Sequence, residues 1–308
     1  MQQFLFEKHR PTPLVRRTVP GKLVFDFMKI LVTGGSGYLG SHVRRYFSAD
    51  DFSRRSNLDI LNPKDTEQVQ DYDAVIHLAA YMDKSLPGAD LSFRTNAEGT
   101  RNLLQHMRPN SVFIYASTKD VYGKNANVYP AAVPETCETV YANHSAFEWS
   151  KLIGERYVEY YAAQRKFRAC IFRLSAVYAR PTSGNENGFV THYVESVKHR
   201  WPIRLPASAD PRRDILYVDD FSRACQAFID SALLLGLYNL GGGSANAAYL
   251  REIIQTVGNL IQLEPVIEND EGLPLPDPLH YVSDLTRVRE ELGWEPSVSI
   301  EEGLRNLL

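Results

Sequence analysis

The sequence predicts an α/β fold, a doubly wound parallel sheet with a smaller, interleaved C-terminal domain. Short apolar runs alternate with segments of helical periodicity, and the first run ends in a glycine-rich turn. Strands that are separated by helices form βαβ units, whose strands lie parallel in one sheet. The predicted strands are residues 29–33, 51–53, 74–78, 111–115, 169–173 and 237–240, and the predicted helices are residues 38–47, 95–107, 145–164 and 219–234.

Changes in composition divide the chain into three parts. Residues 1–27 mix apolar residues, arginines and prolines without a continuous apolar stretch, so we interpret them as an N-terminal extension and not as a secretory signal. Residues 28–182 carry the regular alternation of the sheet domain. After this, Pro, Gly and Asn break the chain into shorter pieces. Residues 183–308 are therefore expected to form mainly a second domain, with about 215–242 returning to the sheet.

The composition excludes several classes of protein. The 308 residues are 44% hydrophobic and 23% charged, as in a globular protein with a buried core. The formal net charge of -3 gives no electrostatic basis for binding nucleic acid or an anionic membrane surface. Cys137, Cys170 and Cys225 form no C-x-x-C pair, so neither a disulfide framework nor a metal site is expected. No apolar run reaches the roughly 18 residues of a membrane span, and we expect a cytoplasmic protein.

The segment 33–40 predicts a site for the phosphates of a dinucleotide. It places Gly34, Gly37 and Gly40 between a predicted strand and a predicted helix. Gly34 allows the tight turn, Gly37 lets the backbone approach a pyrophosphate, and Gly40 permits close packing of the helix on the strand. The free N–H groups and the dipole at the helix start favour negative phosphates. We therefore expect NAD or NADP as the cofactor.

The next predicted strand carries residues that distinguish the two cofactors. An acidic residue there would accept hydrogen bonds from the 2′-hydroxyl of NAD, whereas arginines accommodate the 2′-phosphate of NADP. The strand 51–53 is followed by Arg54 and Arg55, so NADP is favoured over NAD. A solvated basic turn explains the two arginines equally well.

Further motifs resemble the extended short-chain dehydrogenase/reductase family, and within it the nucleotide-sugar epimerases, dehydratases and reductases. The resemblance runs from residue 28 nearly to the C-terminus, with the motifs in the family's order. Besides the glycine turn, these motifs are residues 77–80, 95–96 with 99–104, 117–123, 150–151 with 154–155, 173–178, 213–220, 238–242 and 292–296. They imply a Rossmann domain, a substrate-binding C-terminal domain and an active site at the carboxyl ends of the strands.

The resemblance also implies further cofactor contacts. Asp59 and Ile60 are expected to border the adenine. The other expected contacts are Tyr38, Leu39, Leu78, Ala79, Ala80, Asn96 and Lys151. Similar proteins commonly dimerise through a pair of helices, so a homodimer is a further expectation.

One catalytic side chain of the family is absent. In similar proteins a tyrosine four residues before the lysine acts as acid and base, and this spacing places both side chains on one helix face. Lys151 and Thr118 match the scheme, with Lys151 holding the nicotinamide ribose and Thr118 contacting the reacting oxygen. Phe147 occupies the tyrosine position. Because phenylalanine has no exchangeable proton, acid–base assistance worth roughly 10²–10⁴-fold in rate is missing.

Three explanations for Phe147 stay open. It is an engineered replacement that traps a complex, a natural variant with a substitute group, or a feature of a protein that binds cofactor and ligand without turnover. Asp120, Tyr141 and His144 are the candidate substitutes, and Asp120 stands where related dehydratases and decarboxylases carry a glutamate. A solvated carboxylate and a packed histidine are the purely structural alternatives.

The expected substrate site also departs from the family. Arg213 is expected to bind a nucleotide diphosphate, oriented by Asp214, and Asn187 is a further expected contact. Ala176 stands where the family supplies an asparagine. The resulting hypothesis is NAD(P)-dependent epimerisation, dehydration or reduction of a nucleotide sugar. The alternatives are a non-catalytic NAD(P)-binding sensor or partner-binding protein, and a reductase of a ketone without a nucleotide.

Overall fold

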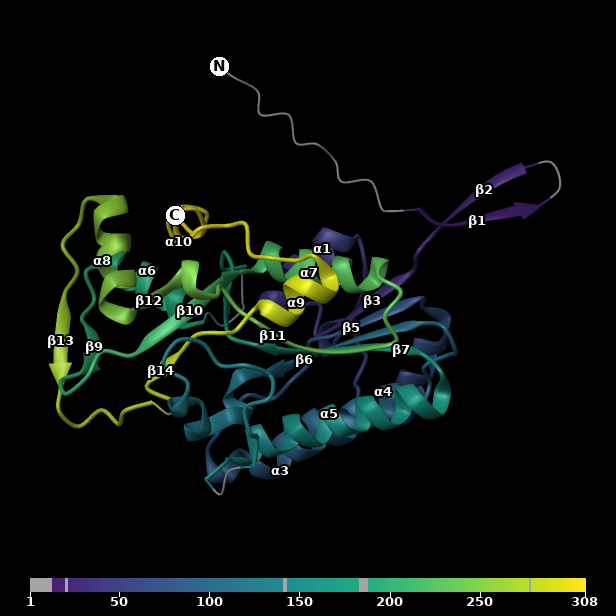
Figure 1. Ribbon diagram of the computed structural model, residues 1–308, viewed down its shortest axis with the longest axis horizontal. Helices are drawn as coiled ribbons and strands as arrows, with labels where there is room; N and C mark the ends of the chain where they lie inside the picture. Colours follow the sequence, from purple (N-terminus) through teal and green to yellow (C-terminus); the bar gives the residue numbers. More distant parts are fainter. Residues whose placement is uncertain (1–12, 20–21, 141–142, 183–187, 277) are drawn as a thin grey trace, which may run out of the picture.

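The computed structural model describes residues 13–19, 22–140, 143–182, 188–276 and 278–308. Its centre is a parallel sheet with the strand order β4-β3-β5-β6-β7-β11 (Figure 1). β3 pairs with β4 on one side and β5 on the other, so the winding reverses there, and such sheets bind ligands at this reversal. The strands are β3 (Ile30–Thr33), β4 (Asp50–Phe52), β5 (Ala74–His77), β6 (Val112–Thr118), β7 (Arg168–Leu174) and β11 (Leu235–Leu240).

Helices cover both faces of this sheet (Figure 1). Successive strand residues point to opposite faces, so Ile30 and Val32 pack in one hydrophobic core and Leu31 in the other. The first core includes side chains of α1 (Tyr38–Phe47), α7 (Val218–Asp230) and α9 (Thr286–Leu292). The second core lies against the π-helical segment η4 (Phe93–Gly99), α4 (Thr100–Leu104) and α5 (Ala146–Arg165).

Short helices fill the connections at the edges of the sheet. They are η1 (Arg54–Ser56), α2 (Pro63–Thr66), η2 (Glu67–Asp71), η3 (Leu86–Gly88), α3 (Ala89–Ser92) and η5 (Lys119–Val128). η3 and α3 follow β5, and η5 follows β6, so both connections begin at the carboxyl edge of the sheet.

A second, smaller sheet surrounds β10 (Arg212–Tyr217). β10 pairs in parallel with β8 (Ala176–Tyr178) and β14 (His280–Tyr281), and antiparallel with β12 (Ala247–Tyr249). β11 lies between these strands in sequence but pairs with β7, so the chain returns to the large sheet there. The remaining elements of this part are α6 (Phe189–His199), β9 (Ile203–Pro206), η6 (Ser244–Asn246), α8 (Leu250–Ile261), β13 (Ile267–Asp270) and α10 (Ile300–Arg305).

Before β3, the strands β1 (Pro13–Val19) and β2 (Lys22–Phe27) form an antiparallel pair of their own. The sequence predicts no secondary structure in this segment. Figure 1 shows the pair extending from the end of the molecule that carries β3. Within the described ranges, no helix has the length and apolar character that crossing a membrane requires.

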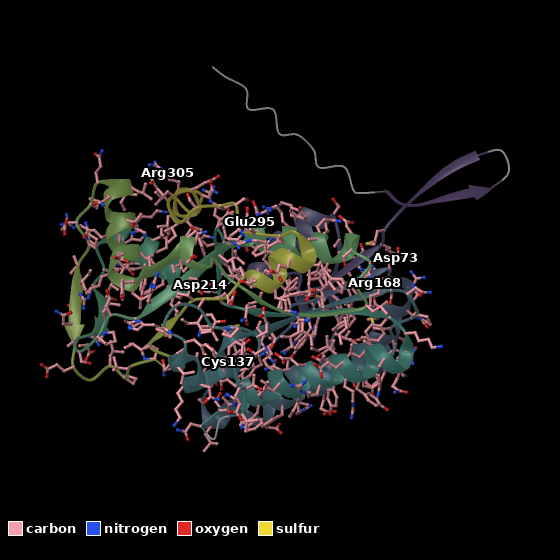
Figure 2. The ribbon with its side chains drawn as sticks, viewed as in Figure 1. Asp73, Cys137, Arg168, Asp214, Glu295 and Arg305 are labelled. Carbon is pink, nitrogen blue, oxygen red and sulfur yellow. The ribbon has the colours of Figure 1, made fainter. Side chains whose placement is uncertain are left out.

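The fold class is confirmed, and α1 matches its predicted range, but two other predicted helices differ. The predicted helix 95–107 is divided into η4 and α4, and the Thr100 hydroxyl donates to the Asn96 carbonyl at 2.6 Å, competing with the regular backbone bonds of this turn. The predicted helix 219–234 ends as α7 at Asp230. The Arg168 guanidinium, labelled in Figure 2, donates to four backbone carbonyl oxygens in the last turn of this helix and just after it. These are the carbonyl oxygens of Phe228, Ile229, Ser231 and Leu233.

Candidate active site

The glycine turn joins β3 to α1 at the carboxyl edge of the large sheet. Gly34 has a φ of +70°, a left-handed conformation that favours glycine. A Cβ atom on Gly40 would lie 2.0 Å from the Gly34 carbonyl oxygen, so only glycine lets α1 pack this closely on the turn. α1 begins without a side-chain cap and without an acidic residue in its first turn. Its first N–H groups and its dipole are therefore available to an anion.

The segment after β5 lies against the same turn. A Cβ atom on Gly34 would lie 2.9 Å from the backbone nitrogen of Ala79, so the two backbones approach closely. The Ala79 N–H donates to Thr33 Oγ1 at 3.3 Å, and His77 Nδ1 lies 2.5 Å from the same oxygen. Burial lowers the pKa of His77 to about 3, so its ring is neutral at physiological pH. This network holds residues 78–80 beside the turn, where the cofactor prediction requires them.

β4 places a carboxylate next to the glycine turn. Asp51 Oδ2 accepts a hydrogen bond from the Ser53 hydroxyl at 2.9 Å. Asp51 Oδ1 is buried and has no hydrogen-bond partner among the described residues. A Cβ atom on Gly35 would meet this oxygen at 2.7 Å, so it faces the turn. A buried, unpaired acceptor at this point suits a hydroxyl donor of a bound ribose.

The two predicted arginines stand on the solvent side of the same turn. Arg55 donates to the Ser36 carbonyl at 3.2 Å, and the exposed Arg54 lies 4.0 Å from the Asp59 carboxylate. Ile60, next in the chain, is buried. The glycine turn is therefore bordered by a carboxylate, Asp51, of the kind that binds the ribose of NAD, and by two arginines of the kind that bind the 2′-phosphate of NADP.

Asn96 is buried in η4 and links two parts of the site. Its amide nitrogen donates to the Tyr81 carbonyl at 2.8 Å and to Ser150 Oγ at 3.0 Å, while its oxygen accepts from the Tyr81 N–H at 2.8 Å. Asn96 thus ties the loop after β5 to α5. Its side chain therefore fixes the position of this loop against α5.

α5 carries the expected catalytic lysine. The helix begins at a capping box in which Ser145 and Glu148 satisfy each other's backbone N–H groups. Lys151, one turn further on, is buried, and its Nζ donates to the Ala116 carbonyl at 2.8 Å. Burial lowers the pKa of Lys151 to about 8. Its ammonium is therefore close to titrating at physiological pH.

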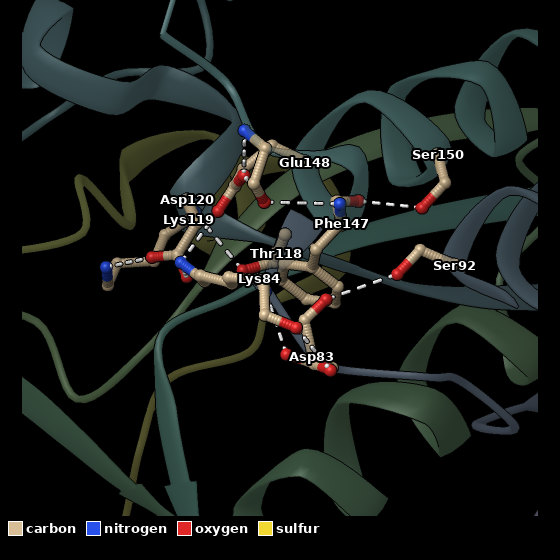
Figure 3. A network of polar contacts seen from close by, with 11 residues as sticks. Asp83, Lys84, Ser92, Thr118, Lys119, Asp120, Phe147, Glu148 and Ser150 are labelled. Atoms are coloured by element: carbon tan, nitrogen blue, oxygen red, sulfur yellow. Dashed lines mark hydrogen bonds and ion pairs between the residues drawn. The ribbon is translucent and has the colours of Figure 1, made fainter. Parts of the chain in front are cut away.

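Thr118 is the last residue of β6. Beside it, four charged side chains from the loop after β5, from η5 and from α5 form what we call the lysine–carboxylate cluster: Lys84, Lys119, Asp120 and Glu148 (Figure 3). Thr118 Oγ1 accepts from the Asp120 N–H at 3.1 Å. Lys84 Nζ lies 2.7 Å from Asp120 Oδ2 and 2.7 Å from Glu148 Oε1. Lys119 pairs with the other oxygen of Asp120.

Within this cluster the charges hold one another ionised. Burial alone would raise the pKa of Asp120, but Lys119 and Lys84 hold it well below its usual range. Burial alone would lower the pKa of Lys84, but Asp120 and Glu148 raise it above its usual value. For Lys119, burial prevails and lowers the pKa. A carboxylate held ionised in this way is a poor proton acceptor.

Phe147 lies on α5, next to Glu148 of this cluster and one helical turn before Lys151. Its ring is buried, and Lys84 Nζ stands 5.5 Å from the ring centre. Figure 3 shows Lys84, Thr118 and Phe147 together in one close view. The position that resembles the family's acid–base tyrosine thus presents a ring and a neighbouring ammonium, but no hydroxyl.

Of the other proposed substitutes, His144 packs edge-on against Trp149, with ring centres 5.4 Å apart. Burial lowers the pKa of His144, and its ring also interacts with the backbone of Val121. Tyr141 lies outside the described residues. The structure therefore makes His144 a packed side chain beside the cluster.

The expected substrate contacts are arranged differently from the prediction. The Arg213 guanidinium is largely buried and donates to the carbonyl oxygens of Arg212, Pro278 and Leu279. The expectation that Asp214 orients Arg213 is wrong. The Asp214 carboxylate, marked in Figure 2, instead accepts from the Ser175 hydroxyl and the backbone N–H groups of Gly243 and Ser283.

Two other predicted positions complete the substrate side. Ala176 lies in β8, paired with Ile215 of β10. Asn187 falls outside the described residues.

A cavity of about 540 Å³ lies at a different edge of the sheet, beside Cys137 (labelled in Figure 2) and β11. Its lining includes Arg156 of α5 and Arg287 of α9, but none of the predicted site residues. Burial raises the pKa of Cys137 to about 11, so its thiol is not an activated nucleophile. This cavity therefore lies apart from the predicted site.

The carboxyl edge of the sheet fits a nicotinamide dinucleotide. The glycine turn, the uncapped start of α1 and the unpaired oxygen of Asp51 lie at one end, and Thr118 of β6 and Lys151 of α5 lie nearby. The lysine–carboxylate cluster adds Lys84, Lys119 and Glu148, which sequence reasoning did not select. For Glu148, the sequence offers the spacing of the capping box as a signal. For Lys84 it offers none, because Lys84 lies 36 residues from its partner Asp120 in the chain.

Comparison with known proteins agrees with this geometry. CDP-paratose 2-epimerase of Salmonella typhi is 26% identical over 339 residues, covering 91% of this chain and 98% of that protein. GDP-6-deoxy-D-mannose reductase of Pseudomonas aeruginosa is 25% identical, covering 91% and 96%. The solved structure of UDP-glucose 4-epimerase from Thermotoga maritima with UDP-glucose has a TM-score of 0.76 and 26% identity, covering 91% of this chain and 97% of that chain.

These relatives support the prediction of an enzyme and not the alternative of a non-catalytic binding protein. The model of the NAD dependent epimerase/dehydratase family matches residues 30–241, which include the glycine turn, Thr118, Phe147, Lys151 and Arg213. Since this match spans most of the sequence, the chain belongs to the NAD dependent epimerase/dehydratase family.

Proposed function

We propose that this protein binds NADP or NAD and acts on a nucleotide sugar as an epimerase, dehydratase or reductase. The observation that carries the proposal is the convergence of the glycine turn, Lys151 and Thr118 at the carboxyl edge of one parallel sheet. Family membership supports the cofactor. The relatives above are named for CDP-, GDP- and UDP-linked sugars, which supports the substrate class.

In this proposal the pyrophosphate binds at the start of α1, where the glycines let the backbone approach and the helix presents N–H groups. Arg54 and Arg55 favour NADP through its 2′-phosphate. The proposed cofactor contacts are Gly34, Gly37, Tyr38, Leu39, Gly40, Arg54, Arg55, Asp59, Ile60, Leu78, Ala79, Ala80, Asn96 and Lys151.

The bound cofactor supplies or takes up hydride. The Lys151 ammonium would hold the nicotinamide ribose, and the Thr118 hydroxyl would bond the reacting oxygen of the sugar. Asp120 would hold Thr118 in place through its backbone N–H. Arg213 and Asn187 remain proposed contacts to the nucleotide diphosphate. Burial lowers the pKa of Arg213, and the nearby charge of Asp120 opposes this effect only in part.

The experiment that tests this function is titration of the purified protein with NADPH and NADH, following nicotinamide fluorescence. It is repeated with UDP-, GDP-, dTDP- and CDP-linked sugars. We expect binding of a reduced nicotinamide, strengthened by one class of nucleotide sugar, and turnover of that sugar. If neither cofactor binds, the proposal is wrong. If a cofactor binds but no nucleotide sugar changes its affinity or reacts, the substrate class is wrong.

We further propose that the protein is a cytoplasmic homodimer. The neighbouring elements η4 and α5 expose the aromatic side chains of Phe93, Trp149 and Tyr160. Exposed aromatic surface of this kind supports a contact between copies. Light scattering after size exclusion would measure the mass, and a monomer at micromolar concentration would contradict the dimer.

A further inference from the structure

We propose that Lys84 transfers the proton at the reacting oxygen of the substrate, in place of the hydroxyl that Phe147 lacks. The inference rests on the proposed function and adds a catalytic group to the same site. It follows from the position of Lys84 in the lysine–carboxylate cluster and from the arrangement of the other ionisable groups nearby.

Lys84 is aimed at Phe147 by two carboxylates. It follows β5 in the loop that Asn96 holds through Tyr81. Asp120 Oδ2 and Glu148 Oε1, each 2.7 Å from Nζ, come from the ends of two different elements, η5 and α5, and fix the ammonium between them. Nζ lies 5.5 Å from the ring centre of Phe147, and half of the side chain is exposed. The ammonium is therefore both held in place and open to a ligand and to water.

The other ionisable groups nearby are less suited to this step. Asp120 is held ionised by two ammonium groups. His144 packs on Trp149. Lys151 is buried with its Nζ on the Ala116 carbonyl and 5.0 Å from the Tyr115 ring centre. Lys84 combines a position beside the Phe147 ring with a half-exposed side chain, whereas Lys119 of the same cluster is largely buried.

The charged groups around Lys84 determine whether its side chain carries a proton. They come from Lys119 and Asp120 after β6, and from His144 and Glu148 at the start of α5. Because Asp120 and Glu148 raise its pKa, Lys84 is an ammonium at neutral pH and donates rather than accepts a proton. The ammonium is the form that protonation of a carbonyl oxygen during reduction of a keto sugar requires.

The proposed step transfers one hydride and one proton to the carbonyl group. The carbonyl carbon gains a hydride from the reduced nicotinamide, and the carbonyl oxygen takes a proton from Lys84. One N–H bond breaks, its electron pair stays on the nitrogen, and one O–H bond forms. The neutral amine regains a proton from water at its exposed side.

The test compares the full-length protein with Lys84→Met and Lys84→Arg, using NADPH and a panel of UDP-, GDP-, dTDP- and CDP-linked 4-keto sugars. Lys84→Arg keeps the ion pairs, but a guanidinium does not give up its proton at neutral pH. We expect both variants to bind NADPH within two-fold of the unchanged protein and to lose about 10²–10⁴-fold in kcat. Lys64→Met, an exposed lysine at the start of α2, is the matched control and should retain full activity.

Restoring the phenol separates a chemical role from a structural one. Phe147→Tyr added to Lys84→Met should recover turnover, and the alkaline limb of the pH profile should move when tyrosine replaces lysine as the donor. Unchanged kcat in Lys84→Arg, or no recovery in the double variant, would overturn the role of Lys84 while leaving the proposed function intact. If only Phe147→Tyr is active, Lys84 does not replace the phenol. If no protein reduces any keto sugar although NADPH binds, the role of Lys84 is wrong, and the nucleotide-sugar titration described above decides between the epimerase and dehydratase activities of the proposed function.

Discussion

The cofactor side and the proton-transfer side of the site follow their family to different degrees. On the cofactor side, Gly34 and Gly40 allow approaches that any Cβ atom would block, and α1 begins without a cap or an acidic residue. On the proton-transfer side, a buried phenylalanine replaces the tyrosine, and Lys84 is held there by Asp120 and Glu148.

The difference shows which requirement each side must meet. A pyrophosphate is bound by backbone N–H groups, so the backbone path is constrained and glycines cannot be replaced. A proton can be delivered by any positioned donor of suitable acidity. The proton-transfer side can therefore change its residues while the cofactor side retains them. The following predictions test the two sides in order of decreasing effect.

The largest effect is expected from Gly40→Ala. The new Cβ would lie 2.0 Å from the Gly34 carbonyl oxygen and 2.8 Å from its carbon, so the backbone of the turn must move. We expect the free energy of unfolding to fall by more than about 3 kcal/mol and NADPH binding to be lost. Urea unfolding and nicotinamide fluorescence measure the two effects. Gly272→Ala, at an exposed turn, is the control, and NADPH binding by Gly40→Ala at unchanged affinity would show that the packing of the turn does not matter.

The buried lysine predicts a pH dependence of stability. Burial lowers the pKa of Lys151 from 10.5 to about 8 in the folded protein. Between these two values the unfolded chain binds a proton that the folded chain does not, so the free energy of unfolding rises with pH. With about 1.4 kcal/mol for each unit of pKa, the buried Lys151 ammonium lowers the free energy of unfolding by about 3 kcal/mol at pH values below its folded pKa. This penalty disappears as the pH rises from about 8 to 10.5.

Lys151→Met should remove this contribution. The measurement is urea unfolding without cofactor, from pH 7.5 upward, for the unchanged protein and the variant. The free energy of unfolding of the unchanged protein should rise with pH relative to that of the variant. Parallel curves would mean that the Lys151 ammonium is already well solvated in the folded protein.

A smaller effect is expected from replacing both arginines at the glycine turn with alanine. Both arginines are exposed, and Arg55 donates to the Ser36 carbonyl at the rim of the turn, so the fold should be retained. A hydrogen bond to a charged group is worth about 1.5–3 kcal/mol, so NADPH affinity should fall about 10–100-fold while NADH affinity stays unchanged. Equal losses for both cofactors would assign the arginines to a general role, and tighter binding of NADH by the unchanged protein would contradict the preference for NADP.

The smallest effect is expected from Ser145→Ala at the start of α5. The serine hydroxyl caps the helix by accepting from the Phe147 N–H, and its loss should cost about 1 kcal/mol of stability. Because Lys151 is one turn further along, its contact with the Ala116 carbonyl should persist and NADPH affinity should stay unchanged. Thermal unfolding and fluorescence titration measure these effects. A large loss of affinity would show that the cap also positions the cofactor side.

Local patterns predicted the large sheet well because its signals lie within short windows. The apolar runs around Ile30 and Ile76 and the helix 38–47 depend on neighbouring residues alone. The π-helical turn at Asn96 was not predicted, because its bonds to Tyr81 and Ser150 come from distant segments. The partners of Asp214 were mispredicted for the same reason, since Ser175, Gly243 and Ser283 lie just before β8, after β11 and after β14, far from Asp214 in the chain.

The sequence by itself determined the fold class, the position of the glycine turn, and the presence of Lys151 and Thr118 with phenylalanine one turn before the lysine. Each of these is encoded by residue type and spacing along a few turns of chain. Only the tertiary structure decided that Lys84 meets Asp120 and Glu148 beside Phe147, and that Arg213 binds the carbonyl oxygens of Pro278 and Leu279. These contacts join residues from separate strands and helices, and their geometry exists only once the sheet has brought its carboxyl edge together.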